Sequence, residues 1–214
     1  MKKQVYNPFL PLYEYIPDGE PHVFGNRIYH YGSHDKEGGY TFCMEDYVVY
    51  SAPVDDLTSW KCEGVSYRAN QDPDYSQFPY MYAPDVVQGN DGKYYLYYCM
   101  AGEYGIGGYT RPISVAVSNH PAGPFEYLDH IHFADGTIMQ KYVCFDPAVL
   151  NDNGTIRIYY GTRYNYEERE DFEQNDDLVK IEMDMFGKTR EDILSYLTHP
   201  ESCKSGDPKN PDSI

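Results

Sequence analysis

Short tyrosine-rich and β-branched runs alternate along the chain with clusters of Asn, Asp, Gly and Pro. Three such runs, at residues 27–31, 93–98 and 155–160, each follow a tight-turn signal and a preceding short run. The turn signals are Gly25-Asn26, Asn90-Asp91-Gly92 and Asn151-Asp152-Asn153-Gly154. Asn, Asp and Gly adopt the positive φ angles of short hairpin turns, so each turn is expected to join two antiparallel strands.

The hairpins repeat at a regular interval. An Asp stands at the start of each first strand, at Asp18, Asp85 and Asp146, with steps of 67 and 61 residues. A second marker agrees, because the strand-like runs at 47–51 and 113–118 end on serines that are again 67 residues apart. Four short antiparallel strands in every unit of about 60 residues is the pattern of a propeller blade. A β-sandwich also has regular short strands, but nothing in that fold requires an Asp at this interval.

The sequence therefore predicts an all-β propeller of antiparallel four-stranded blades over residues 1–187. The blades are expected at about 15–66, 82–128 and 144–187. Residues 188–214 end in a Pro-, Asp- and Ser-rich stretch without a strand pattern, so we expect a linker or a frayed tail there.

Composition narrows the class of partner. The 34 acidic and 17 basic residues give a net charge of −17, which repels the phosphates of nucleic acids and of anionic lipids. A neutral oligosaccharide or glycoside is compatible with this charge. The 25 tyrosines suit both packing within sheets and stacking on sugar rings, and we expect packing to account for most of them.

The cysteines and the N-terminus bear on location. The five cysteines show neither a CxxC motif nor a metal-ligand spacing with His, and an odd, scattered set is typical of reduced thiols. The N-terminus lacks the apolar segment of a signal peptide, and no stretch is long and apolar enough to span a membrane. We therefore expect a cytoplasmic protein with no metal and no cofactor.

Strand direction gathers the candidate chemistry at one end of the blades. Because antiparallel strands reverse direction, the Asp before each first strand lies at the same end as the loops after the second and fourth strands. These long loops are 34–45, 67–82, 100–111, 128–143 and 161–177. Carboxylates that converge near a propeller axis suit glycoside hydrolysis, where one activates water and another protonates the leaving oxygen. An Asp beside Pro can also simply cap a turn, but three in register with the repeat favour a functional role.

Each predicted blade opens with a motif. The motifs are Tyr-Ile-Pro-Asp-Gly-Glu-Pro at 15–21 with residues 26–35, Tyr-Ala-Pro-Asp-Val-Val at 82–87 with 91–98, and Phe-Asp-Pro-Ala-Val at 145–149 with 151–154. They resemble, in this order, the opening, second-blade and third-blade signatures of glycoside hydrolase family 43, whose members are five-bladed β-propellers. The resemblance runs from about Asn7 to Gly187. It implies that about three of the five family blades are present.

The resemblance also implies roles for individual residues. Asp18 matches the general base, and Asp146 matches the Asp that tunes the pKa of the general acid and orients it. Asp85 matches an Asp that lines the site, so it is a candidate substrate contact. The general acid of the family is a Glu that opens the fourth blade, which we expect to be absent here; Glu201 lacks the strand pattern that should follow such a Glu.

Five further residues are candidate substrate contacts. His34 and Asp35 lie in the loop after the second strand, where the alternative is a solvated turn. Tyr82 and Phe145 flank the aspartates and are suited to stack on a sugar, with core packing as the alternative. Arg163 lies in a loop on the same face.

The implied function is inverting hydrolysis of pentose-containing glycans, either xylosides or arabinofuranosides, with the general-acid blade lacking. One alternative is a non-catalytic glycan-binding remnant, and another is a chain that a partner completes. Three blades of five leave apolar blade faces uncovered, so we also expect self-association or a completing partner.

Overall fold

The computed structural model describes residues 7–105, 107–108, 111–140, 144–161, 183 and 189–191. The chain divides into two compact units, Met1–Thr162 and Arg163–Ile214. Nearly all described residues belong to the first unit, to which the following account is confined. The predicted later strands of the third blade and almost all of the tail at 188–214 lie outside the described residues.

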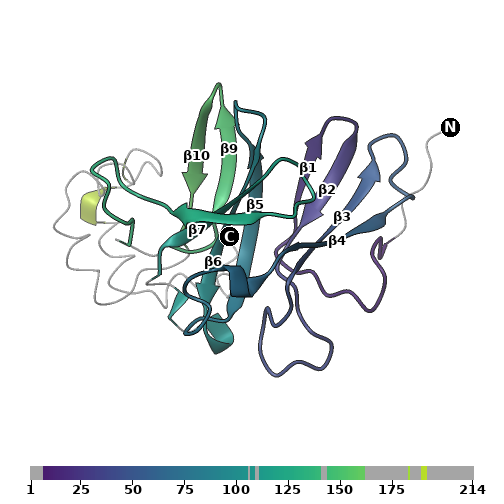
Figure 1. The fold of residues 1–214 in the computed structure, drawn as a ribbon, viewed down its shortest axis with the longest axis horizontal. Coiled ribbons are helices and arrows are strands. Elements are labelled where there is room, and N and C mark those ends of the chain that lie inside the picture. The colour runs from purple at the N-terminus through teal and green to yellow at the C-terminus, as the bar shows by residue number, and fades with distance from the viewer. Residues whose placement is uncertain are drawn as a thin grey trace. The chain divides into compact units, whose positions relative to one another are not determined.

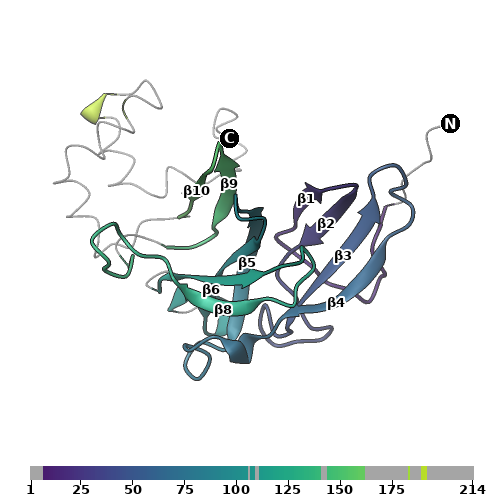
Figure 2. The ribbon, with the colours of Figure 1, turned by 45° about the horizontal axis from the view of Figure 1, so that its top comes forward.

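Two four-stranded antiparallel sheets and one hairpin make up the first unit (Figures 1 and 2). The first sheet runs in the order β1 (Glu20–Phe24), β2 (Arg27–Tyr31), β3 (Tyr47–Pro53) and β4 (Lys61–Tyr67). The second sheet runs in the order β5 (Tyr80–Gln88), β6 (Tyr94–Ala101), β7 (Ile113–Ser118) and β8 (Glu126–His130). The hairpin pairs β9 (Ala148–Asp152) with β10 (Thr155–Tyr159), and two short 3-10 turns cover Ala69–Gln71 and Glu103–Gly105. The prediction of an all-β chain of antiparallel four-stranded sheets is confirmed, and we call the two sheets blade 1 and blade 2.

The turn residues form the hairpins that the sequence predicts, with one difference in length. Phe24 pairs with Arg27 and Asp152 with Thr155, so the β1–β2 and β9–β10 turns have two residues between paired positions. In blade 2 the pairing ends at Gln88 and Tyr94, which leaves residues 89–93 as a longer loop. This difference matters for the register of the aspartates.

The innermost strands β1, β5 and β9 are neighbours, because β5 contacts both of the others. The apolar core is formed between the blades and is rich in buried tyrosine, as expected from the composition. The hydroxyls of Tyr67 and Tyr98 lie 2.8 Å apart, and Tyr98 donates to Asp72 Oδ2 at 2.6 Å. Tyr67 and Tyr98 therefore each fill the core with the ring and pair the hydroxyl, as most buried tyrosines do.

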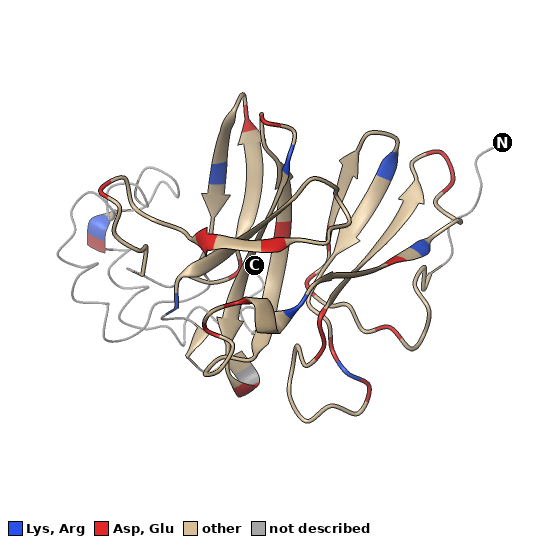
Figure 3. Cartoon of the chain, in the orientation of Figure 1, with Lys and Arg blue, Asp and Glu red and all other residues tan. Residues whose placement is uncertain are grey.

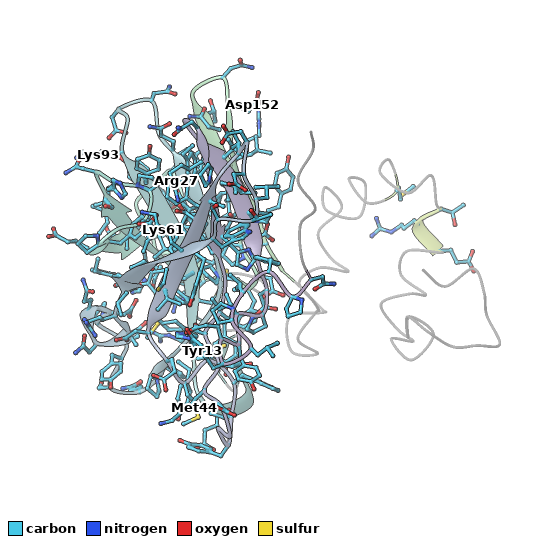
Figure 4. The ribbon with its side chains drawn as sticks, turned by 90° about the vertical axis from the view of Figure 1, so that its right-hand side faces the viewer. Tyr13, Arg27, Met44, Lys61, Lys93 and Asp152 are labelled. Carbon is cyan, nitrogen blue, oxygen red and sulfur yellow. The ribbon has the colours of Figure 1, made fainter. Side chains whose placement is uncertain are left out.

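The two ends of the blades carry different connections between strands, tight turns at one end and long loops at the other. Lys93 and Asp152, which belong to the hairpins between first and second strands, lie at one end, whereas Tyr13 and Met44 lie at the other (Figure 4). The long loops that follow second strands therefore extend from the end opposite the tight turns. In the described part, acidic residues are spread over strands and loops of both blades (Figure 3).

Candidate active site

Asp18 and Asp146 share an unusual backbone conformation. Asp18 has φ 55° and Asp146 has φ 49°, and each lies two residues before an innermost strand, β1 or β9. Left-handed backbone is uncommon outside glycine, and it concentrates at functional sites when the surrounding structure enforces it. The two positions are therefore structurally equivalent in the first blade and in the hairpin that follows blade 2.

Ala83, rather than Asp85, is their counterpart in blade 2. Ala83 has φ 43° and lies at the irregularity in β5 between Tyr82, which pairs with Cys99, and Asp85, which pairs with Tyr97. The prediction that Asp85 stands at the start of its strand, in register with the other two aspartates, was wrong. The loop at 89–93 is longer than the other two turns, and it includes positions that belong to the first strand in the other hairpins. At a similar distance in sequence from its turn, Asp85 therefore lies within β5 instead of before it.

Asp85 ties three segments together through its carboxylate, and the residue is only 2% exposed. Its Oδ1 lies 2.5 Å from His22 Nε2 of β1 and accepts from the N–H of Val86 at 2.7 Å. Its Oδ2 accepts from the N–H of Val149 in β9 at 2.6 Å. Both oxygens are thus occupied by protein donors, and this geometry gives no support to a substrate contact for Asp85.

Glu20, His22 and Asp85 form the one group of three potential metal ligands found within the described residues, with their ligand atoms within 4.8 Å of one another. Partial burial, and then the negative charge of Asp85, raise the pKa of Glu20, while His22 opposes the shift. Since both oxygens of Asp85 already accept protein hydrogen bonds, the cluster is satisfied as an ion-pair and hydrogen-bond network.

Asp18 and Asp146 are electrostatically coupled. Both residues reach solvent. The groups packed around Asp146 still desolvate its carboxyl and raise its pKa, and the negative charge of Asp18 raises it further. Within the described part of the chain, neither carboxylate forms an ion pair with Lys or Arg. A solvent-accessible carboxyl whose proton affinity is raised by burial and by a second carboxylate is typical of acid–base sites.

The structure adds a residue that the sequence analysis missed. Ser33, at the end of β2, is fully buried, and its Oγ donates to Asp18 Oδ2 at 2.8 Å. The same Oγ accepts from the N–H of Ala83 at 2.8 Å. A serine after a strand carries no motif of its own, and the contact spans 50 residues of sequence, so only the folded chain reveals it.

Tyr82 and Phe145, the two rings suggested to stack on a sugar, are mostly buried, each 7% exposed. Their ring centroids lie 5.7 Å apart. The Tyr82 hydroxyl donates to the carbonyl of Gly102 at 3.1 Å and accepts from the N–H of Gly105 at 3.0 Å. The geometry is that of core packing, and stacking on a sugar stays a prediction for both rings.

The loop at 34–45 is held by the two residues singled out from the sequence. His34 Nδ1 lies 2.6 Å from the carbonyl oxygen of Asp46, and its Nε2 lies 3.3 Å from Glu14 Oε2. Asp35 Oδ1 accepts from the N–H of Cys43 at 2.7 Å. Asp35 also lines an open hollow of about 340 Å³ in this loop. Contacts of His34 and Asp35 with substrate stay predictions, and Arg163 lies outside the described residues.

Of the described cysteines, Cys43, Cys99 and Cys144 are buried and Cys62 is exposed. Burial raises the pKa of Cys43 to about 12, so this thiol near Asp18 is neutral and a poor nucleophile. The expected cytoplasmic location stays a prediction. Across the described ranges, no helix has the length and apolarity needed to cross a bilayer.

Known proteins match this chain in sequence over most of its length. Residues 9–206 match the profile of glycosyl hydrolases family 43. A xylosidase/arabinosidase of Thermoclostridium stercorarium is 46% identical over 166 residues, which are 75% of this chain and 34% of that protein. Xylosidase/arabinosidase 43A of Humicola insolens is 33% identical over 159 residues, which are 69% of this chain and 43% of that protein. The chain thus spans between about a third and a half of the length of these relatives.

Solved structures show the same relationship. The GH43_1 enzyme of Xanthomonas citri complexed with xylose is 31% identical with a TM-score of 0.53, covering 71% of this chain and 41% of that chain. The same enzyme complexed with xylotriose gives 28% identity and a TM-score of 0.53, over 73% of this chain and 42% of that chain. The family profile covers far more than half of the sequence, and the antiparallel blades agree with it. The chain therefore belongs to glycosyl hydrolase family 43.

Proposed function

We propose that this chain supplies two of the three catalytic carboxyl groups of an inverting glycosidase, with Asp18 as the general base. The observation that carries the proposal is the coupled, solvent-accessible pair of Asp18 and Asp146, each in left-handed backbone before an innermost strand. In the reaction, Asp18 removes a proton from a water molecule, whose oxygen then attacks the anomeric carbon. The glycosidic C–O bond breaks as an acid protonates the leaving oxygen, so the sugar is released with inverted configuration.

Asp146 acts on the acid rather than on the sugar in this proposal. A carboxylate beside the acid raises the acid's proton affinity, as like charges do, and so keeps the acid protonated at neutral pH. The charge of Asp18 raises the pKa of Asp146 in the same way, which supports a position of Asp146 within electrostatic range of the reacting region. We propose that the acid itself comes from outside residues 7–161, either from elsewhere in the polypeptide or from a partner chain.

The proposed substrates are pentosides of the xylan type. The two curated relatives described above carry the names xylosidase and arabinosidase, and the structural neighbour binds xylose and xylotriose. The net charge of −17 suits a neutral glycoside better than an anionic polymer. We also propose that the chain associates with itself or with a partner that covers the outer blade faces, because open blade edges and faces favour association.

The stereochemistry of hydrolysis tests the proposed reaction. With an aryl β-D-xyloside and an aryl α-L-arabinofuranoside, we expect the first sugar product seen by ¹H NMR to have the inverted anomeric configuration. Retention would contradict a general-base role for Asp18, since a retaining enzyme needs a nucleophile in its place. The assay is run on the isolated chain and on the active assembly, by which we mean this chain together with the segment or partner that supplies the acid. The mass of each species is measured by light scattering. Sugar binding by calorimetry without turnover in either form would instead favour a glycan-binding protein.

A further inference from the structure

The hydroxyl of Ser33 connects Asp18 with the backbone of blade 2. Ser33 is fully buried. Its Oγ lies 2.8 Å from Asp18 Oδ2 on one side and 2.8 Å from the backbone nitrogen of Ala83 on the other. Three segments distant in sequence, before β1, after β2 and within β5, therefore meet at one oxygen atom.

The directions of the two hydrogen bonds at Ser33 Oγ follow from which groups can donate. A serine hydroxyl has one proton to donate and two lone pairs to accept with, whereas a backbone N–H can only donate. The N–H of Ala83 therefore occupies a lone pair of Ser33, and the single hydroxyl proton is left to point at the carboxylate of Asp18. The nearby Cys43 thiol, whose pKa burial raises to about 12, is neutral and does not compete for this role with a charge.

Two features of the backbone make the contact possible. A Cβ on Gly32 would lie 2.6 Å from the carbonyl oxygen of Pro17, so only glycine lets the end of β2 approach the segment that carries Asp18. Ala83 lies at the irregularity of β5 with φ 43°, outside the paired positions of the strand, and its N–H is directed to Ser33 instead of to β6. Gly32 and the irregularity at Ala83 thus both allow the two hydrogen bonds that link Asp18, Ser33 and Ala83.

We propose that Ser33 is a positioning residue for the general base. Its hydroxyl donates to Oδ2 of Asp18, fixes the rotation of the carboxylate, and leaves Oδ1 to take the proton from water. The N–H of Ala83 holds the hydroxyl in turn, so blade 2 sets the orientation of a base carried by blade 1. This inference rests on the proposed function, in which Asp18 is the base.

The contact itself is tested without any assay of activity. The melting temperatures of the 214-residue chain are compared for Ser33→Ala, Asp18→Ala and the double variant at pH 7. We expect the double variant to lose clearly less than the sum of the two single losses, because each single change already removes the shared hydrogen bond. Strain from Ala in the left-handed position of Asp18 occurs in both backgrounds and cancels. Additive losses would overturn the proposal.

The positioning role is tested in the catalytically active assembly. A hydrogen bond to a charged group has the strength to change a rate by roughly 10-fold or more, so we expect Ser33→Ala to lower kcat by about 10-fold. We also expect KM to change by less than about 2-fold, because the buried Ser33 acts through Asp18 and not on the substrate. A purely structural role would not lower kcat while leaving KM unchanged.

A matched control removes an equally buried hydroxyl elsewhere in blade 1. Ser51 on β3 is fully buried, accepts from Arg27 and donates to Glu63. Ser51→Ala is expected to lower the melting temperature while leaving kcat unchanged. If Ser33→Ala behaves in the same way, the positioning role is overturned while the proposed function stands. If Asp18→Asn also retains full kcat, the proposed function itself fails.

Discussion

Replacing Asp18 with Asn is expected to lower kcat on an aryl xyloside by about 10²–10⁴-fold in the active assembly, the usual contribution of a general base. The amide has the shape of the carboxylate but cannot accept a proton from water. Asn also tolerates the left-handed backbone at this position, where φ is 55°, so the loss should reflect chemistry and not misfolding. Initial rates at saturating substrate, together with the melting temperature, measure the two effects separately.

Asp152→Asn is the control for this substitution. Asp152 lies at the end of the blades where the tight hairpin turns are, opposite Tyr13 and Met44 (Figure 4), and its carboxylate pairs with Arg157. The same chemical change there should leave kcat within about 2-fold of wild type, since the residue is remote from the loops of the site. Wild-type kcat in Asp18→Asn would remove the base from the proposed mechanism.

Asp85→Ala is expected to lower the free energy of unfolding by about 3–5 kcal/mol, because a donor that loses its acceptor inside the protein costs about 1–3 kcal/mol. The substitution leaves three groups without their acceptor, namely His22 and the N–H groups of Val86 and Val149. Because these groups belong to β1, β5 and β9, the loss loosens the contact among all three innermost strands. Urea denaturation followed by tyrosine fluorescence measures the change.

Asp129→Ala provides the comparison for Asp85→Ala. The side chain of Asp129 on β8 is 62% exposed, so its removal should change the free energy of unfolding by no more than about 0.5 kcal/mol. A loss of less than about 1 kcal/mol for Asp85→Ala would show that the inter-blade network is not a principal support of the fold.

The strands and turns of this chain could be predicted because their signals are local. Gly25-Asn26 and Asn153-Gly154 form tight turns, which require positive φ at Gly25, Asn153 and Gly154. The runs beside these turns form the paired strands. Asp18 and Asp146 were found for a related reason. In both hairpins a two-residue turn keeps the distance from turn to aspartate the same, so sequence offset and position along the strand agree.

The error at Asp85 and the omission of Ser33 have a common physical origin. Both depend on which residues face each other across the fold, which no local pattern specifies. The loop at 89–93 leaves Asp85 three positions before the last paired residue of its strand, instead of six as for Asp18 and Asp146. The left-handed backbone that carries the other two aspartates falls on Ala83. The role of Ser33 arises from a hydrogen bond with Ala83 across 50 residues and from a close approach to the segment of Asp18, which the absence of a side chain at Gly32 allows.

The central claim is that Asp18 and Asp146 act on one reacting region, and the titration of Asp146 tests it most directly. The pKa of Asp146 is followed through its side-chain ¹³C carboxyl resonance in the wild-type chain and in Asp18→Asn. In wild type we expect this pKa to lie above the ordinary value of 3.8, because burial and the charge of Asp18 both raise it. In Asp18→Asn the pKa of Asp146 should fall yet stay above 3.8, since the larger cause, burial, remains. An identical pKa of Asp146 in both proteins would contradict the claim that the two carboxylates share one site.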